Sequence, residues 1–155
     1  MRSRLAIAFI GSCLAVLGSA GAAAASIPGG FAQLAGTAGC VANGGAGGCT
    51  TAHDLGTNVK IAISPDGRNA YVTTYMSNNS LLVFDRDPGT GALTQKPGQA
   101  GCFHIAAATA NCASVPLMTA PFAMAFTPDG RTLYVTAQQS ARVLTFTRDP
   151  ASGEL

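Results

Sequence analysis

The sequence has no tryptophan, and only 6% of its residues are aromatic and 10% are charged. Soluble domains average about 25% charged residues, so this chain has little of the usual polar surface. Disorder is nevertheless excluded, because 48% of the 155 residues are hydrophobic. The 19 glycines and 8 prolines instead predict many short strands joined by tight turns.

An excess of charge of either sign is also missing. The formal net charge is +2, and it comes from Arg2 and Arg4 at the start of the chain. The other seven basic residues equal the seven acidic ones in number. We therefore expect no nucleic-acid partner and no binding to anionic lipid, since each requires a basic patch.

Residues 1–25 have the pattern of a secretory signal peptide. The two arginines precede an apolar stretch over residues 5–17, which is followed by glycine and alanine. An Ala-Ala-Ala run ends at Ala25, so the small-x-small rule predicts cleavage between Ala25 and Ser26. The apolar stretch is shorter than the roughly 20 residues that span a bilayer. We expect a helical signal segment, export to the periplasm or cell surface, and no stable membrane span after cleavage.

Cys13 lies inside this segment and allows an alternative interpretation. Residues 10–13 read Ile-Gly-Ser-Cys, which loosely resembles a bacterial lipobox. In a lipobox the cysteine ends the apolar stretch, whereas here the apolar residues continue past Cys13. The favoured interpretation is a small residue that is discarded with the signal peptide.

A turn followed by a strand occurs twice in the remaining chain. Residues 64–73 read SPDGRNAYVT, and residues 127–136 read TPDGRTLYVT, 63 positions later. Proline fixes φ, aspartate accepts bonds from the following backbone, and glycine adopts positive φ, so the motif is typical of a hairpin turn. The predicted turn residues are Pro65, Asp66, Gly67, Pro128, Asp129 and Gly130.

The residues on both sides of the motif also match between the two occurrences, so the motif is part of an internal repeat. Alternation and turn residues predict four strands in the first repeat, over 58–64, 69–75, 80–87 and 92–96. The second repeat has strands over 122–127, 131–137 and 141–149, and a fourth begins at 154. A further short strand is expected over 31–34. We divide the chain into a signal peptide (1–25) and a repeat region (26–155), with repeats of about 31–95 and 96–155.

Four of the five cysteines follow the same period. Cys40 and Cys102 are 62 residues apart, and Cys49 and Cys112 are 63 apart. Each repeat thus has one near-local pair, which in an exported chain predicts the disulfides Cys40–Cys49 and Cys102–Cys112. Closing a loop of about ten residues removes roughly 2.5–3 kcal/mol of unfolded-state entropy.

Two other interpretations of this region are weaker. A zinc site needs closer cysteine spacing and paired histidines, but His53 and His104 do not occupy equivalent repeat positions. The glycine-rich stretch over 41–48 lacks the strand, helix and lysine of a phosphate-binding loop. We expect a flexible surface loop closed by the disulfide, and neither a metal nor a cofactor.

Four short antiparallel strands per repeat are typical of a β-propeller blade, so the predicted fold class is all-β. The turn at 64–68, the Tyr-Val-Thr strand, the Phe-x-Arg-Asp-Pro segment at 84–88 and the Gly-Ala-Leu at 91–93 resemble YVTN-type repeats. Such repeats occur in secreted bacterial propellers of the lactonase-like (6-phosphogluconolactonase-like) superfamily. The resemblance covers roughly 31–155 and implies an incomplete propeller of two blades, since such propellers close with about six to eight. It favours an N-terminal fragment over assembly of several copies.

Functional residues are expected where the two repeats differ, because recurring residues such as Asp66 and Asp129 fit a structural role in the turns. The polar residues that differ are His53, Asp54, Lys60, His104, Gln138, Gln139 and Arg142. The His53-Asp54 pair precedes the first strand of a blade, a position that often borders the central channel. No catalytic motif is recognisable, so the catalytic residues stay unassigned.

Two functions from different classes remain open. The first is a secreted propeller module with a binding or structural role, which the regular repeats favour. The second is the N-terminal part of a lactonase-like hydrolase that acts on a cyclic ester, which the family resemblance implies. The expected partners are an unknown ligand or further blades.

Overall fold

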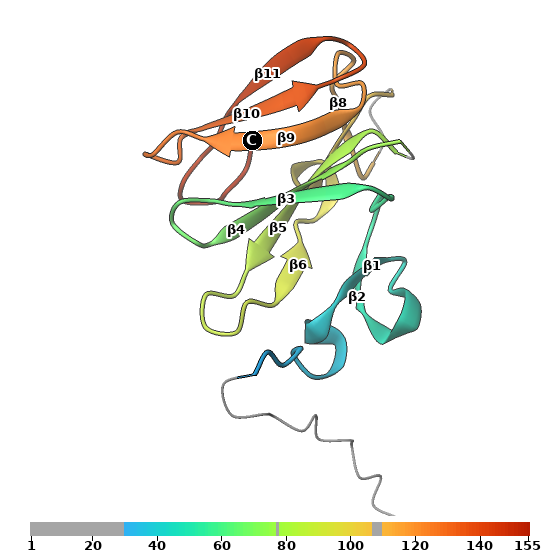
Figure 1. Cartoon of the computed structure of the whole chain (residues 1–155), viewed down its shortest axis with the longest axis vertical. Coiled ribbons are helices and arrows are strands. Elements are labelled where there is room, and N and C mark those ends of the chain that lie inside the picture. Colours follow the sequence, from blue (N-terminus) through green and yellow to red (C-terminus); the bar gives the residue numbers. More distant parts are fainter. Residues whose placement is uncertain (1–29, 77, 107–109) are drawn as a thin grey trace, which may run out of the picture.

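The computed structural model describes residues 30–76, 78–106 and 110–155. The predicted signal peptide, the cleavage site at Ala25 and Ser26, and Cys13 lie outside these residues. The described part is all-β apart from three short 3-10 segments, as predicted (Figure 1). In these ranges no helix has the length and apolar character required to cross a bilayer.

The 3-10 segments are η1 (Gly36–Gly39), η2 (Ala46–Gly48) and η3 (Gly98–Gly101). The first strands are β1 (Val41–Asn43), β2 (Thr50–Ala52), β3 (Val59–Ile63), β4 (Asn69–Thr74), β5 (Ser80–Arg86) and β6 (Leu93–Gln95). They are followed by β7 (Cys102–His104), β8 (Ala113–Ser114), β9 (Pro121–Phe126), β10 (Thr132–Ala137) and β11 (Arg142–Thr147).

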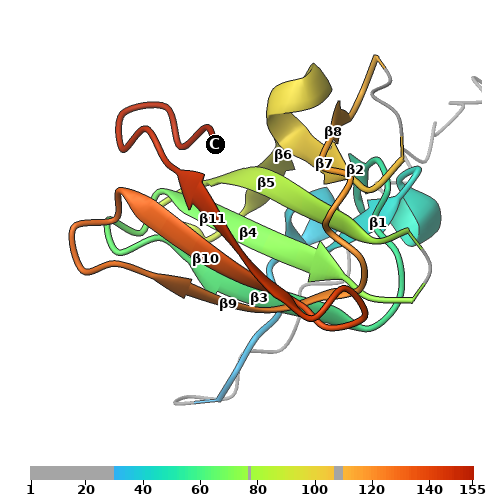
Figure 2. The same cartoon turned by 90° about the horizontal axis from the view of Figure 1, so that it is seen from above.

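Two antiparallel sheets form the body of the molecule. Strands β3, β4, β5 and β6 pair in chain order, and we call this unit blade one. Strands β9, β10 and β11 pair in the same way and form blade two. Blade two lies over one face of blade one (Figures 1 and 2). This stacking of short antiparallel sheets is how propeller blades bury their faces.

Successive side chains of each strand point to opposite faces of the sheet, and this alternation explains which residues form the core. One face of blade one points at blade two, and the other carries an apolar cluster beside the second disulfide. The buried residues between the blades are Tyr71, Leu81, Val83, Phe103, Met118, Leu133 and Val135. The buried residues on the opposite face are Ala52, Ala70, Val72, Leu82, Phe84, Cys102 and Cys112. Strand β4 is buried along its whole length because both of its faces are covered.

The repeated motif forms the same hairpin turn in both blades. Asp66 Oδ1 accepts hydrogen bonds from Ser64 Oγ (2.6 Å) and from the Arg68 backbone N–H (3.1 Å). Asp129 accepts the equivalent pair from Thr127 and Arg131. Glycine follows each aspartate at φ of 72° and 67°, a conformation that costs other residues energy.

Two predictions about the segments outside the blades were wrong. Residues 31–34 form no strand. The stretch between Cys40 and Cys49, expected as a flexible loop, instead begins with β1, which pairs in parallel with β2. The equivalent β7 and β8 pair in the same way in the second repeat. These strands have only two or three residues, so sequence alternation gives no usable signal, and their pairing partners stabilise them.

Candidate functional site

A hollow of about 310 Å³ lies beside the first strands of the two blades. Its lining residues are Asn58, Val59, Lys60, Tyr75 and Phe122. Val59 and Lys60 belong to β3 and Phe122 to β9, whereas Asn58 directly precedes β3 and Tyr75 directly follows β4. Figure 1 shows β3 and β9 as neighbours. The hollow is therefore a product of blade packing.

Aromatic and cationic contacts shape this hollow. The Lys60 ammonium lies 4.8 Å from the centre of the Phe122 ring, within the range of a cation–π interaction. The Tyr75 ring meets the Phe122 ring edge-on at 6.0 Å. One ammonium group beside a phenol and an amide is suited to bind an anionic or hydroxylated ligand. Carboxylates and imidazoles, the usual general bases, are not among the lining residues that the structure describes.

His53, which was expected to border a central channel, lies away from this hollow. Its backbone N–H donates to Gln95 Oε1 at 2.6 Å, and its carbonyl accepts from Gln95 Nε2 at 3.2 Å. Gln95 belongs to β6, the fourth strand of blade one, whereas the candidate hollow lies at the first strand. His53 thus lies against β6, the last strand of the β3–β6 meander, and the order of residues in the sequence does not reveal this contact.

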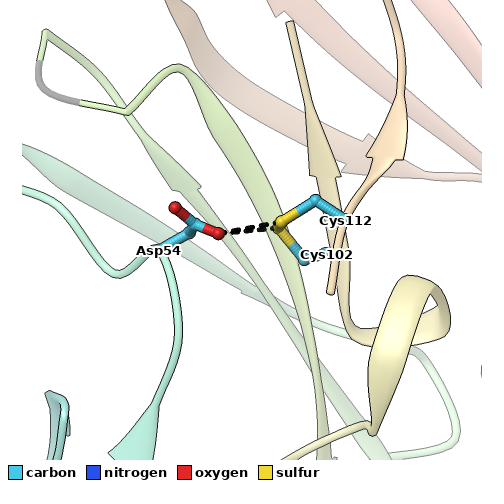
Figure 3. Close-up of side chains that lie close together, drawn as sticks. All are labelled: Asp54, Cys102 and Cys112. Carbon is cyan, nitrogen blue, oxygen red and sulfur yellow. Dashed lines mark hydrogen bonds between the residues drawn. A yellow bond between two sulfur atoms is a disulfide. The ribbon is translucent and has the colours of Figure 1, made fainter. Parts of the chain in front are cut away.

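Asp54 contacts the second disulfide (Figure 3). Its Oδ2 atom lies 2.8 Å from Cys112 Sγ and 3.6 Å from Cys102 Sγ. Because both sulfurs are bonded to each other, neither carries a proton to donate or acts as a thiolate ligand. The cluster has the composition of a metal site, but it offers a single carboxylate and thus does not fit a thiolate metal centre.

The structure contains both cysteine pairs as disulfides. Cys40 and Cys49 have a Cα–Cα distance of 4.9 Å, and Cys102 and Cys112 one of 4.5 Å. Both distances lie in the usual range for a disulfide. The second pair is buried against blade one, whereas the first is only partly buried.

The other polar residues that differ between the repeats do not converge. His104 is on β7, where its Nδ1 accepts from the Ala106 backbone N–H at 3.0 Å. Gln138 donates its backbone N–H to the carbonyl of Ala120 at 3.0 Å, and Gln139 follows it in the turn after β10. Arg142 donates to the carbonyl of Ser140 at 2.8 Å. Of the predicted residues, only Lys60 lines the candidate hollow.

A buried polar cluster that was not predicted from the sequence joins the two blades. Arg148 follows β11, and its side chain is fully buried. It donates to Tyr71 Oη (2.8 Å), Asp66 Oδ2 (2.8 Å) and Asn69 Oδ1 (2.7 Å) on blade one. Its Nη1 atom also donates to the Gly130 carbonyl at 3.1 Å. We call this cluster the blade junction.

The junction shifts the protonation equilibria of its members. Burial disfavours the charged form of Asp66, but hydrogen bonds from Ser64, Arg148 and the Arg68 backbone outweigh it and lower the pKa to about 2. Burial raises the pKa of Tyr71. Burial disfavours the charge on Arg148, but its bonds to Asp66 and Tyr71 raise its pKa overall. Asp66 and Tyr71 thus keep Arg148 charged although its side chain has no access to solvent. This is a structural function.

One sequence signal could have identified this arginine. Phe84 to Pro88 matches Phe146 to Pro150, and each segment contains an arginine before an aspartate. By itself this match indicated only the repeat. A charged residue that recurs at the end of a strand is a candidate for a contact between repeats.

Comparison with known proteins identifies the family. The sequence model of "Lactonase, 7-bladed beta-propeller" matches residues 48–155. No curated protein matches the chain. Among solved structures, a candidate 6-phosphogluconolactonase from Bacteroides fragilis matches with 24% identity and a TM-score of 0.45, covering 61% of this chain and 22% of that one. The periplasmic gluconolactonase of Pseudomonas aeruginosa matches with 28% identity and a TM-score of 0.46, again covering 61% and 22%.

The chain therefore spans about a fifth of the length of these solved proteins. The family match includes all the strands of both blades, the hairpin turns and the blade junction. It covers more than half of the sequence and agrees with the all-β architecture, so the chain belongs to the lactonase family of seven-bladed β-propellers.

Proposed function

We propose that this chain forms part of a lactonase-like propeller that hydrolyses a cyclic ester. The family match over residues 48–155 carries the proposal. The hollow at β3 and β9 supports it, because Lys60 presents a cation beside an aromatic floor. A sugar lactone, with its hydroxyl groups and polar carbonyl, is a suitable ligand for such a surface.

In the proposed reaction, water adds to the lactone carbonyl, the ring C–O bond breaks, and a hydroxy acid forms with release of a proton at neutral pH. Negative charge develops on the carbonyl oxygen, and a nearby ammonium group stabilises it. We assign this role to Lys60. The described lining of the hollow holds no carboxylate or imidazole, so in this proposal other blades contribute the general base.

A binding or structural role is the second candidate function. The observation in its favour is the same lack of a general base in the described lining of the hollow. In that case Lys60 and its aromatic neighbours would hold a ligand without turnover.

We also propose that the protein acts outside the cytoplasm, after removal of the signal peptide. Both cysteine pairs form disulfides, and structural disulfides persist in oxidising compartments. Mass spectrometry of the chain recovered from periplasm and culture medium should find Ser26 as the first residue. Recovery of the intact Met1 form from the cytoplasm would contradict this proposal.

The enzymatic proposal is tested in a pH-stat by measuring proton release from glucono-δ-lactone with a propeller that contains this chain together with the blades that supply the general base. We expect release above the buffer rate, and Lys60→Met should lower the excess rate at least tenfold. Lys96→Met is the matched control, because Lys96 pairs with Asp85 at 2.7 Å on the opposite side of blade one. A rate equal to that of buffer would reject hydrolysis of this lactone, and calorimetric binding of gluconate without turnover would favour the second candidate.

A further inference from the structure

Strand β9 contains an irregularity that its repeat equivalent, β3, does not have. The pairing of β3 with β4 is continuous over Val59–Ile63. In blade two the pairs on either side of a register shift are Met124 with Val135 and Pro121 with Ala137. Two residues of β9, Phe122 and Ala123, therefore lie opposite the single residue Thr136 of β10. This is a β-bulge, a feature that is common beside active sites, where it redirects a side chain. We call it the β9 bulge.

Two threonine hydroxyls bind the backbone of the β9 bulge. Backbone groups at a bulge fall outside the regular ladder and need other partners. Within blade two, the Ala123 N–H donates to Thr136 Oγ1 at 2.9 Å. From blade one, the Thr73 hydroxyl donates to the Phe122 carbonyl at 2.8 Å. Thr73 is fully buried, so water does not compete for its hydroxyl, and the bond connects β4 directly to the bulge.

Blade one also holds the residue that directly precedes β9. Ala120 is buried and has a φ of 56°, a conformation that is costly for a residue with a Cβ atom. Its backbone N–H donates to Oδ1 of Asn79, which lies between β4 and β5, at 2.8 Å. A residue in such a conformation persists only where its surroundings fix it. Blade one therefore determines where β9 begins.

Two neighbouring residues of blade one contact the same residue of the bulge. Lys60 and Thr73 are directly opposite each other on β3 and β4, so their side chains lie on one face of the sheet. The Thr73 hydroxyl binds the Phe122 carbonyl, and the Lys60 ammonium lies 4.8 Å from the centre of the Phe122 ring. The position of this ring beside the ammonium thus depends on where Thr73 holds the Phe122 backbone.

We propose that Thr73 is a positioning residue of the candidate site. Its bond fixes the β9 bulge, the bulge fixes the Phe122 ring, and the ring holds the Lys60 ammonium where negative charge develops on the lactone oxygen. Only this last step rests on the proposed function. An ammonium group that is fixed in advance stabilises the transition state more than the bound substrate. Loss of the Thr73 bond should therefore lower kcat and leave KM nearly unchanged.

The test compares two adjacent threonines of β4. Thr73→Val removes the hydroxyl and keeps a β-branched side chain in the strand. Thr74→Val is the matched control, because Thr74 is equally buried and its Oγ1 accepts the Ser80 backbone N–H at 3.2 Å, inside blade one. Each variant loses one buried hydrogen bond, so both should lose similar stability, and circular dichroism melting checks that both are folded.

Two further variants keep the test decisive if Thr73→Val does not fold. Thr73→Ser retains the hydroxyl and should behave as the unmodified protein. Thr136→Val removes the acceptor of the Ala123 N–H and perturbs the same bulge from blade two, at a residue that is only partly buried. It should change the site in the same direction as Thr73→Val.

The first measurement follows the ε-CH2 signal of Lys60 by NMR, in a propeller that contains this chain and is labelled with ε-13C-lysine. Absence of the signal in Lys60→Arg assigns it. The face of an aromatic ring shifts nearby proton signals upfield. We expect this upfield shift in the unmodified protein and in Thr74→Val, its complete loss in Phe122→Leu, and loss of most of it in Thr73→Val.

The second measurement is the pH-stat assay with the same propeller. Thr73→Val should lower kcat about tenfold, as expected when a reacting group is displaced, with little change in KM. Thr74→Val should leave both constants unchanged.

Three results would overturn the positioning role. The first is a Lys60 signal without an upfield shift in the unmodified protein. The second is a full upfield shift in folded Thr73→Val, and the third is an equal kinetic loss in Thr74→Val. An upfield shift that responds as expected, in a protein that hydrolyses no lactone, would reject the proposed hydrolysis and support the positioning of Lys60 by Thr73.

Discussion

The two blades contain nearly the same turn and strand, yet the same residues differ in environment. Asp66 and Asp129 organise their turns with equivalent hydrogen bonds. Tyr71 is buried and bonded to Arg148, whereas Tyr134 is 41% exposed. The comparison shows that the sequence of a repeat determines its local hairpin, while the neighbouring blade determines burial and charge pairing.

Substitution of the two arginines should give the largest difference in unfolding free energy between the two blades. Arg148→Met leaves the carboxylate of Asp66 and the hydroxyl of Tyr71 without their charged partner inside the junction. Breaking a buried ion pair from one side costs about 3 kcal/mol or more. Arg86→Met should cost less than about 1 kcal/mol, since a partly exposed arginine contributes little. Urea unfolding of dilute protein measures the free energy of unfolding of both variants. Equal losses in the two variants would contradict the comparison.

The tyrosines give a smaller contrast. Tyr71 Oη accepts a bond from Arg148 Nε and donates one to the Gly153 carbonyl. Tyr71→Phe removes both bonds and should lower the free energy of unfolding by about 1–3 kcal/mol. Tyr134→Phe should change it by less than about 0.5 kcal/mol in the monomer, as expected at an exposed position. Thermal melts of the two variants measure the difference, and a larger loss at Tyr134 would show that the outer face is already covered.

The aspartates give the smallest contrast, and it depends on pH. The pKa of Asp66 falls from 3.8 to about 2 on folding, so its ionised form stabilises the fold. This stabilisation is complete above about pH 4 and is lost as the pH falls toward 2. The side chain is 32% exposed, so after allowance for solvent screening we expect about 1–2 kcal/mol.

Asp66→Asn should therefore reduce the change in unfolding free energy between pH 4 and pH 2 by about 1–2 kcal/mol, measured by urea titration at each pH. Asp129→Asn is the matched control. The pKa of Asp129 is also lowered, mainly by its bond from Thr127, but among the described residues no arginine of a neighbouring blade binds this carboxylate. A flat profile for the unmodified protein would show that Asp66 is not stabilised by folding.

Most of the blade strands could be predicted from local pattern. The expected strands over 58–64 and 69–75 correspond to β3 and β4, with ends within one residue. The alternation of apolar and polar residues over the few positions between turns is a local property of the sequence. The spacing of the cysteine pairs is local as well. The strands β1 and β7 were missed, because three-residue strands depend on partners distant in sequence.

The candidate site was less predictable. Lys60 was recognised as a residue that differs between repeats, but its contact with Phe122 joins residues from two blades. The sequence also does not show that the His53 backbone binds Gln95 of β6, on the side of blade one away from the hollow. Position along a chain does not determine which edge of a twisted sheet a loop lies against.

The sequence by itself determined the repeat, the hairpin turns and the β-blade, because these follow from φ preferences and alternation over a few residues. Only the tertiary structure decided that Arg148 binds Asp66 and Tyr71, which lie 82 and 77 residues earlier in the chain. Burial there depends on the second blade covering the first. Nearly identical motifs thus differ in burial, because among the described residues only the motif of blade one is covered by a neighbouring blade.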